Sequence, residues 1–178
     1  MILVDLLADQ QLYRAHTPKW ATQPLSGAGA ASQGGRFNRP GVPALYLSFE
    51  LLTAATEYQQ GSPLLPPLTM VSYTTNLHTL VDLRQLHRSD VWDDLWQDWR
   101  EDWRALAFDQ HTEPPSWVLS DLARDRGAAG IIFPSQACVG GTNVVVYTDQ
   151  LGVRGNTLTV NDPQGLLPTT LASWGPSP

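Results

Sequence analysis

Two arginines near the start of the chain are the first residues that could carry chemistry. Arg36 follows Gly34 and Gly35, and a glycine pair lets the backbone come close to a ligand. An arginine there can make a bidentate contact to a phosphate or a carboxylate. Arg14 lies among apolar residues, where arginine is rare unless it is paired. Taken alone, Arg36 is better explained as a solvated arginine in a surface turn. Arg14 fits a structural ion pair as well as an anion contact.

Four more polar residues stand where an apolar segment turns or ends. Tyr46 lies inside the run Ala-Leu-Tyr-Leu-Ser, and Glu57 is a carboxylate in an Ala- and Thr-rich segment. Ser135 ends one apolar run and Asn143 opens another. Each also has an ordinary structural explanation: core packing for Tyr46, a solvated carboxylate for Glu57, and turn or cap positions for Ser135 and Asn143. Residue by residue, none of them identifies a site.

The sequence lacks the residue spacings that define several common kinds of site. The four histidines have no HExxH-type arrangement, so the sequence predicts no metal site: they are His16, His78, His87 and His111. With Cys138 as the single cysteine, an intramolecular disulfide and a cysteine metal cluster are both excluded. Neither GxGxxG nor GxxxxGK[ST] occurs, so a Rossmann cofactor site and a P-loop are unsupported.

Short strands and helices must position these residues. Strands are predicted at residues 11–16, 42–49, 69–76, 78–84, 130–135, 142–148 and 156–160, and helices at 50–61 and 116–126. The Gly-, Ala-, Ser- and Pro-rich residues 25–43 are predicted to be a loop. Because the elements do not follow strict βαβ alternation, we expect an α+β fold with a mixed, largely antiparallel sheet and flanking helices.

The clearest predicted helix covers residues 90–108. Its tryptophans recur at steps of four, three and four, which places them on one helix face: Trp92, Trp96, Trp99 and Trp103. Such a face more often packs on the core of its own domain. The alternative is an interface with a second copy of the chain, a homodimer, or with a partner protein, because tryptophan is enriched in binding hot spots.

Length and composition predict one domain over residues 1–178, with an irregular tail over about 161–178. The net charge is −6 and Lys19 is the only lysine, which argues against binding to nucleic acid. The N-terminal run MILVDLLADQ lacks the pattern of a secretory signal. No stretch approaches the roughly 20 apolar residues of a membrane span. A cytoplasmic protein without membrane attachment is therefore expected.

Read together, the segments resemble the RES-domain family, which is named after an Arg, a Glu and a Ser. The resemblance rests on LYRAH, then GGRFNRPGVPALYLS, a helix bearing a glutamate, GIIFPS, and finally GTNVVVY. It runs from about residue 11 to 148. It implies a toxin of a bacterial toxin–antitoxin pair, with a fold similar to ADP-ribosyltransferases and with an Xre-like helix-turn-helix antitoxin as partner.

The resemblance also implies a site and a substrate. Arg36, Tyr46 and Glu57 would form its centre, with Arg14 and Ser135 as companions and Asn143 as a further candidate. The arginine of the family name corresponds to either Arg14 or Arg36. The implied substrate is NAD, which is consumed and is not a recycled cofactor, and no metal is needed.

The implied reaction cleaves the nicotinamide–ribose bond, which develops positive charge on the ribose that Glu57 can stabilise. Arg14 and Arg36 would bind the pyrophosphate, Tyr46 would stack on nicotinamide, and Ser135 would bond to ribose or phosphate. Water, phosphate or a protein is the acceptor, so the alternatives are an NAD glycohydrolase, an NAD phosphorylase and a protein ADP-ribosyltransferase. A non-catalytic nucleotide- or partner-binding module is the alternative of another class.

Overall fold

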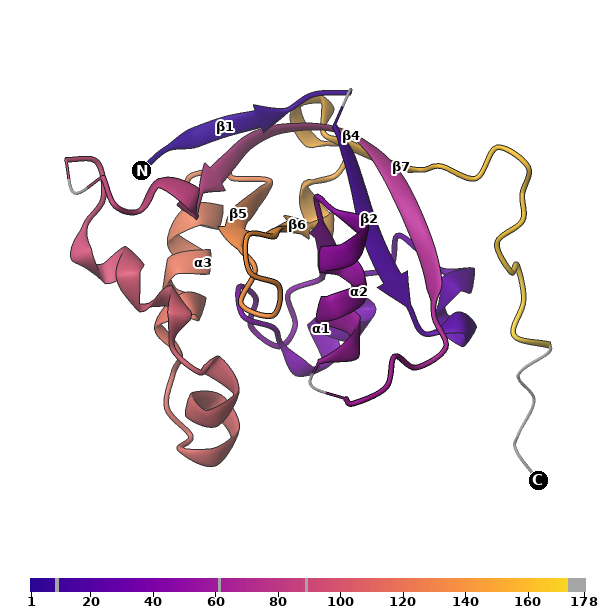
Figure 1. Cartoon of the computed structure of the whole chain (residues 1–178). Helices are drawn as coiled ribbons and strands as arrows, with labels where there is room; N and C mark the ends of the chain where they lie inside the picture. Colours follow the sequence, from indigo (N-terminus) through magenta and orange to yellow (C-terminus); the bar gives the residue numbers. More distant parts are fainter. Residues whose placement is uncertain (9, 61, 89, 173–178) are drawn as a thin grey trace.

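A strongly curved sheet forms the frame of the computed structural model, which describes residues 1–8, 10–60, 62–88 and 90–172 (Figure 1). The strand order is β1-β4-β2-β3-β6-β5, and β7 pairs with β4. The strands are β1 Leu3–Leu6, β2 Gln11–His16, β3 Ala44–Ser48, β4 Thr69–Asp82, β5 Gly130–Pro134, β6 Thr142–Tyr147 and β7 Thr157–Val160.

The long strand β4 closes the sheet on itself. Its first half pairs with β2 from Thr69 to Thr74, and its last residues pair with β5 from Leu80 to Asp82. Because β5 also pairs with β6, the path β4-β2-β3-β6-β5 ends beside β4 again. Only the β4–β5 pairing is parallel among the described strands. The predicted α+β fold with a mixed, largely antiparallel sheet is confirmed.

Three α-helices accompany the sheet within the described residues: α1 Ala28–Gln33, α2 Leu51–Gln59 and α3 Pro115–Asp125. Helix α2 follows β3 and packs on β2, while α3 lies beside β5 (Figure 1). The remaining helical turns are the short 3-10 segments η1 Pro18–Thr22, η2 Leu83–Gln85, η3 Asp94–Arg100, η5 Thr148–Gln150 and η6 Val153–Gly155, and the π-helix η4 Ala105–Asp109. Within the described part of the chain, no helix combines the length and the apolarity needed to cross a membrane.

The core lies on both faces of the sheet. Along β6, Val145 and Tyr147 belong to the cluster shared with α3 and η3, whereas Val144 and Val146 belong to the cluster on the other face. Alternate residues of a strand point to opposite faces, so a strand covered on both sides needs an unbroken apolar run. This accounts for the sequence Val-Val-Val-Tyr, in which every side chain is buried.

The predicted helix over residues 90–108 is wrong as a single element. It is divided into η3 and η4, with an extended backbone at Glu101. Aspartates supply the breaks: Asp93 accepts from the Leu95 amide, and Asp102 accepts from the amides of Arg104 and Ala105. Such side chains compete with the hydrogen bonds of a continuous helix.

The packing role is confirmed for Trp92, Trp96 and Trp99 even though their helix is not, whereas Trp103 lies outside their core cluster. The four side chains are 1–6% exposed, and the first three belong to the core cluster beside α3. The rings are therefore buried by the chain itself and do not form an open face for a second copy. These residues are Trp92, Trp96, Trp99 and Trp103.

Three other predictions need correction. The predicted loop 25–43 contains the short helix α1, and the predicted strands 69–76 and 78–84 are one strand, β4. Strand β4 stays continuous because it changes partners along its length, with a left-handed residue at Thr79. Strand β1 was not predicted. In the predicted tail, residues 161–171 form neither helix nor strand, and 173–178 lie outside the described residues.

Candidate functional site

A pocket of about 320 Å³ opens where β2, β3, α2 and β6 meet the loop before β3. Its size falls within the range of about 300–1,000 Å³ that is usual for ligand pockets. Five of the six residues singled out in the sequence line it: Arg14, Arg36, Tyr46, Glu57 and Asn143. The sixth, Ser135, lies directly behind the wall and is hydrogen-bonded to Glu57. Segments from residue 14 to residue 143 thus converge on one cavity.

The Glu57 carboxylate is held at one oxygen only. Ser135 Oγ donates to Oε1 at 2.7 Å, and Asn143 Nδ2 donates to the same oxygen at 2.5 Å. Ser48 Oγ in turn donates to Asn143 Oδ1 at 2.7 Å, which fixes the orientation of the Asn143 amide. The described residues supply no hydrogen bond to Oε2. Glu57 therefore presents one oriented oxygen to the pocket, unlike the solvated carboxylate considered for it in isolation.

Backbone amides orient the Ser135 hydroxyl. Its Oγ accepts from the amides of Ala137 at 3.2 Å and Cys138 at 2.9 Å, in the turn that leaves β5. Since both acceptor sites of the hydroxyl are used, its proton is directed to Glu57. The serine thus has a defined role as a donor to the carboxylate.

The Gly-Gly-Arg-Phe-Asn segment forms a tight turn that belongs to the pocket wall. Gly35 N donates to Asn38 O at 2.9 Å, and Tyr46 Oη donates to Asn38 Oδ1 at 2.8 Å. The Phe37 amide donates to Tyr46 Oη at 2.9 Å. A Cβ atom at Gly35 would lie 2.5 Å from both Asn38 Oδ1 and Tyr46 Oη, so the turn requires glycine there.

Tyr46 contributes a neutral ring to the pocket. Burial raises the pKa of its phenol far above the ordinary value, and the opposing effects of the Phe37 amide and of Arg36 do not cancel this rise. A phenol of this kind does not act as a general base at neutral pH. What it offers is an aromatic face, fixed by its two hydrogen bonds.

Arg14 is a half-buried cation, and no ion pair to it forms within the described residues. Its Nη1 is inaccessible to solvent and has no hydrogen-bond partner among the described residues. Burial lowers the pKa of its guanidinium, but arginine stays protonated in proteins. An unsatisfied buried charge is costly to a fold. The structural ion pair considered for Arg14 is not formed within the described residues, and its guanidinium lies in the wall of a pocket that can admit an anion.

Arg36 is more fully engaged. Its Nη1 donates to the backbone oxygens of Trp99 and Glu101, both at 2.9 Å, and its Nη2 donates to Gln136 Oε1 at 2.5 Å. Burial lowers the pKa of the guanidinium, and the neighbouring Arg104 adds to the effect. Arg36 is therefore no solvated turn residue: it joins the glycine turn to η3 while also lining the pocket.

The pocket carries a net positive charge in an acidic chain. Three arginines and one glutamate line it, so its formal charge is +2, although the whole chain carries −6. The predicted set did not include several polar and aromatic wall residues, among them Ser48, Trp103, Arg104 and Gln136. The only signal for Trp103 and Arg104 was the tryptophan periodicity, which indicated packing and not a pocket.

Comparison with known proteins supports the fold and identifies the family. A chain in the crystal structure of the M. tuberculosis MbcT–MbcA toxin–antitoxin complex is similar, with a TM-score of 0.60 and 19% identity, over 89% of this chain and 84% of that one. No curated protein sequence matches significantly. The RES domain family model matches residues 11–162, which include β2 to β7 and all six predicted site residues. This match covers most of the sequence, and the chain belongs to the RES domain family.

Proposed function

We propose that this protein is the toxin of a toxin–antitoxin pair and that it depletes NAD by cleaving the nicotinamide–ribose bond. One observation carries the proposal: a carboxylate fixed at one oxygen, Glu57, faces a pocket that also holds the guanidinium of Arg14, which has no partner among the described residues. Membership of the RES domain family and the likeness to a chain of a toxin–antitoxin complex are consistent with it.

The proposed chemistry needs an anion near the ribose. When the bond breaks, its electron pair leaves with the nicotinamide nitrogen and nicotinamide departs as a neutral molecule. Positive charge then develops on the ribose, as in glycoside cleavage. The open Oε2 of Glu57 stabilises this charge, while Ser135 and Asn143 hold the carboxylate in place. The acceptor oxygen bonds to the ribose carbon and releases its proton to solvent or to Glu57.

Recognition of NAD uses the other wall residues. Arg14 offers a guanidinium to the pyrophosphate, which would satisfy a charge that has no protein partner among the described residues. The fixed ring of Tyr46 offers a stacking face for nicotinamide. NAD is then a consumed substrate, and the residues of this pocket require no metal for the reaction.

Nicotinamide release tests the activity. Purified protein is incubated with NAD, with and without phosphate, and the products are separated by chromatography. In a second experiment the protein is incubated with labelled NAD in a cell lysate. We expect free nicotinamide together with ADP-ribose, or with ADP-ribose 1″-phosphate when phosphate is the acceptor. Label on a protein band would assign the activity to a transferase. Absence of nicotinamide release under all these conditions would refute the proposal.

Expression in a bacterial host tests the biological role. The wild-type protein should arrest growth and lower cellular NAD, and Glu57→Ala should do neither. Co-expression of an Xre-like helix-turn-helix antitoxin encoded next to the toxin should restore growth. Continued arrest by a folded Glu57→Ala variant would favour a non-catalytic binding module. Light scattering after size-exclusion chromatography tests the prediction of a homodimer.

A further inference from the structure

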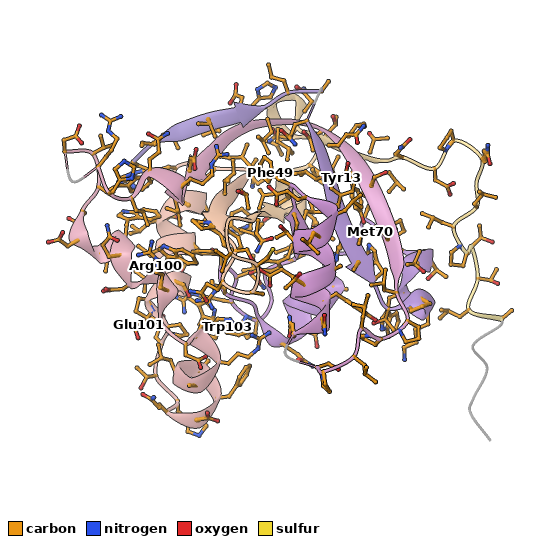
Figure 2. All side chains as sticks on the ribbon, in the orientation of Figure 1. Tyr13, Phe49, Met70, Arg100, Glu101 and Trp103 are labelled. Atoms are coloured by element: carbon orange, nitrogen blue, oxygen red, sulfur yellow. The ribbon has the colours of Figure 1, made fainter. Side chains whose placement is uncertain are left out.

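The segment between η3 and η4 forms part of the pocket, although none of the six predicted site residues belongs to it. Trp103 and Arg104 both line the cavity. In Figure 1 this segment forms a lobe below α3, and Figure 2 shows Trp103 on the side of the lobe that faces α2. The π-helix η4, Ala105–Asp109, follows directly. π-helical turns are rare and are frequent at functional sites.

Arg36 and Gln136 fasten this lobe to the rest of the pocket. Arg36 binds the backbone oxygens of Trp99 and Glu101, at the end of η3, and it also binds Gln136. Gln136 Nε2 completes the attachment by donating to Arg100 O at 3.2 Å. The wall formed by Trp103 and Arg104 is thus held by side chains from the glycine turn and from the turn after β5.

The Arg104 guanidinium forms no ion pair within the described residues, although the nearby Asp102 carboxylate accepts from its backbone amide. The guanidinium lies 4.6 Å from the centre of the Trp103 ring, which limits the directions it can take. Arg104 lines the cavity beside Arg36, where its charge lowers the pKa of the Arg36 guanidinium and the Asp102 carboxylate opposes this effect.

We propose that Arg104, supported on the ring of Trp103, is a second phosphate-binding cation of the pocket, and that Arg36 is a positioning residue that holds the lobe in place. This inference rests on the proposed function, because NAD supplies the pyrophosphate. Arg14 comes from β2 and Arg104 from the lobe, so the two guanidinium groups reach the pocket from separate elements. Together with Arg36 and Glu57 they give the +2 charge that matches two phosphate charges.

Arg104→Gln tests the phosphate contact. A hydrogen bond to a charged group contributes about 1.5–3 kcal/mol, which corresponds to about 10- to 150-fold in affinity. We expect KM for NAD and Kd for ADP-ribose, measured by calorimetry, to rise by about that factor, with a smaller change in kcat. Trp103→Leu should weaken binding in the same direction, and Trp103→Phe, which keeps an aromatic face, should recover part of the affinity.

Arg100→Gln is the matched control. Arg100 is also an arginine of the lobe stacked on a tryptophan, 5.4 Å from the Trp99 ring, but it does not line the pocket. Its substitution should leave KM and Kd within about twofold of wild type. Unchanged KM and Kd in Arg104→Gln, in a protein whose wild type cleaves NAD, would overturn the inference. A wild type that neither cleaves NAD nor binds ADP-ribose would instead refute the proposed function.

Limited trypsin digestion tests the positioning role of Arg36. Wild type and Arg104→Gln should resist cleavage after Arg100, because the lobe stays fastened. Arg36→Gln should be cut there and should also lose affinity for ADP-ribose, and Arg36→Lys should recover part of the protection. A folded Arg36→Gln variant that resists trypsin as wild type does would refute the positioning role, whatever its activity.

Discussion

The substitution Glu57→Gln separates the charge of this side chain from its position. Glutamine keeps the shape of glutamate, and its amide oxygen can still accept from Ser135 and Asn143, as Oε1 does now. The amide nitrogen would then replace Oε2 in the pocket. The fold and the hydrogen bonds behind the pocket wall should therefore persist, while the negative charge is lost.

The size of the effect follows from the charge that is removed. A carboxylate about 4 Å from a developing positive charge contributes about 4 kcal/mol at an effective dielectric constant of about 20. A barrier raised by this amount slows the reaction by about a thousandfold. In the ground state of NAD the positive charge lies on the nicotinamide ring, and it reaches the ribose only as the bond breaks. Most of the loss should therefore appear in kcat, with KM changing by less than about tenfold.

Nicotinamide release under single-turnover conditions measures this effect, and ADP-ribose binding measured by calorimetry checks that the pocket is intact. Glu50→Gln is a matched control at the start of the same helix. Glu50 accepts from Thr53 Oγ1 at 2.7 Å and from the Thr142 amide at 3.0 Å, and it does not line the pocket. It should retain wild-type kcat. A folded Glu57→Gln variant with more than one tenth of the wild-type kcat would refute the electrostatic role of Glu57.

Three further predictions concern stability. Arg14→Met should raise the free energy of unfolding in urea by about 1 kcal/mol, because it removes a half-buried cation whose Nη1 has no partner among the described residues. It should also weaken ADP-ribose binding, and a less stable variant would contradict this. Burial and the nearby Arg14 lower the pKa of His16 from 6.5 to about 4, so the folded state keeps it neutral while the unfolded chain protonates. The free energy of unfolding should therefore fall by about 3 kcal/mol as pH decreases from about 6.5 to about 4, and His16→Gln should lose most of that slope. Trp99→Ala should cost about 3–5 kcal/mol in the same urea measurements, since its ring is 1% exposed, and a loss below about 1 kcal/mol would contradict its core position.

Much of the fold could be predicted because local patterns and burial agree. Strands β3, β5 and β6 are apolar runs bounded by turns, and helix α2 has good helix formers between extended segments. The lobe could not be predicted because its shape depends on distant partners. Arg36 donates hydrogen bonds to the backbone carbonyls at the end of η3. No pattern within residues 90–108 indicates these bonds.

The same reason limits what the sequence says about the site. The six predicted residues could be grouped only through a family resemblance, since their separations along the chain indicate no common pocket. The structure supplies what spacing cannot: Ser135 and Asn143 donate to one oxygen of Glu57, although both lie more than 75 positions away, with separations of 78 and 86. Trp103 and Arg104 carry no local signal of their own, because a ring buried in a core and a ring buried against a pocket have the same periodicity.

These separations have a consequence for the timing of synthesis. A ribosome delivers the chain from its N-terminus, and Glu57 emerges long before the two residues that orient it. Until β5 and β6 leave the exit tunnel, the carboxylate has neither donor, and β3 lacks the neighbour that closes its edge. The site proposed around Glu57 is therefore incomplete until nearly all of the matched segment has been made.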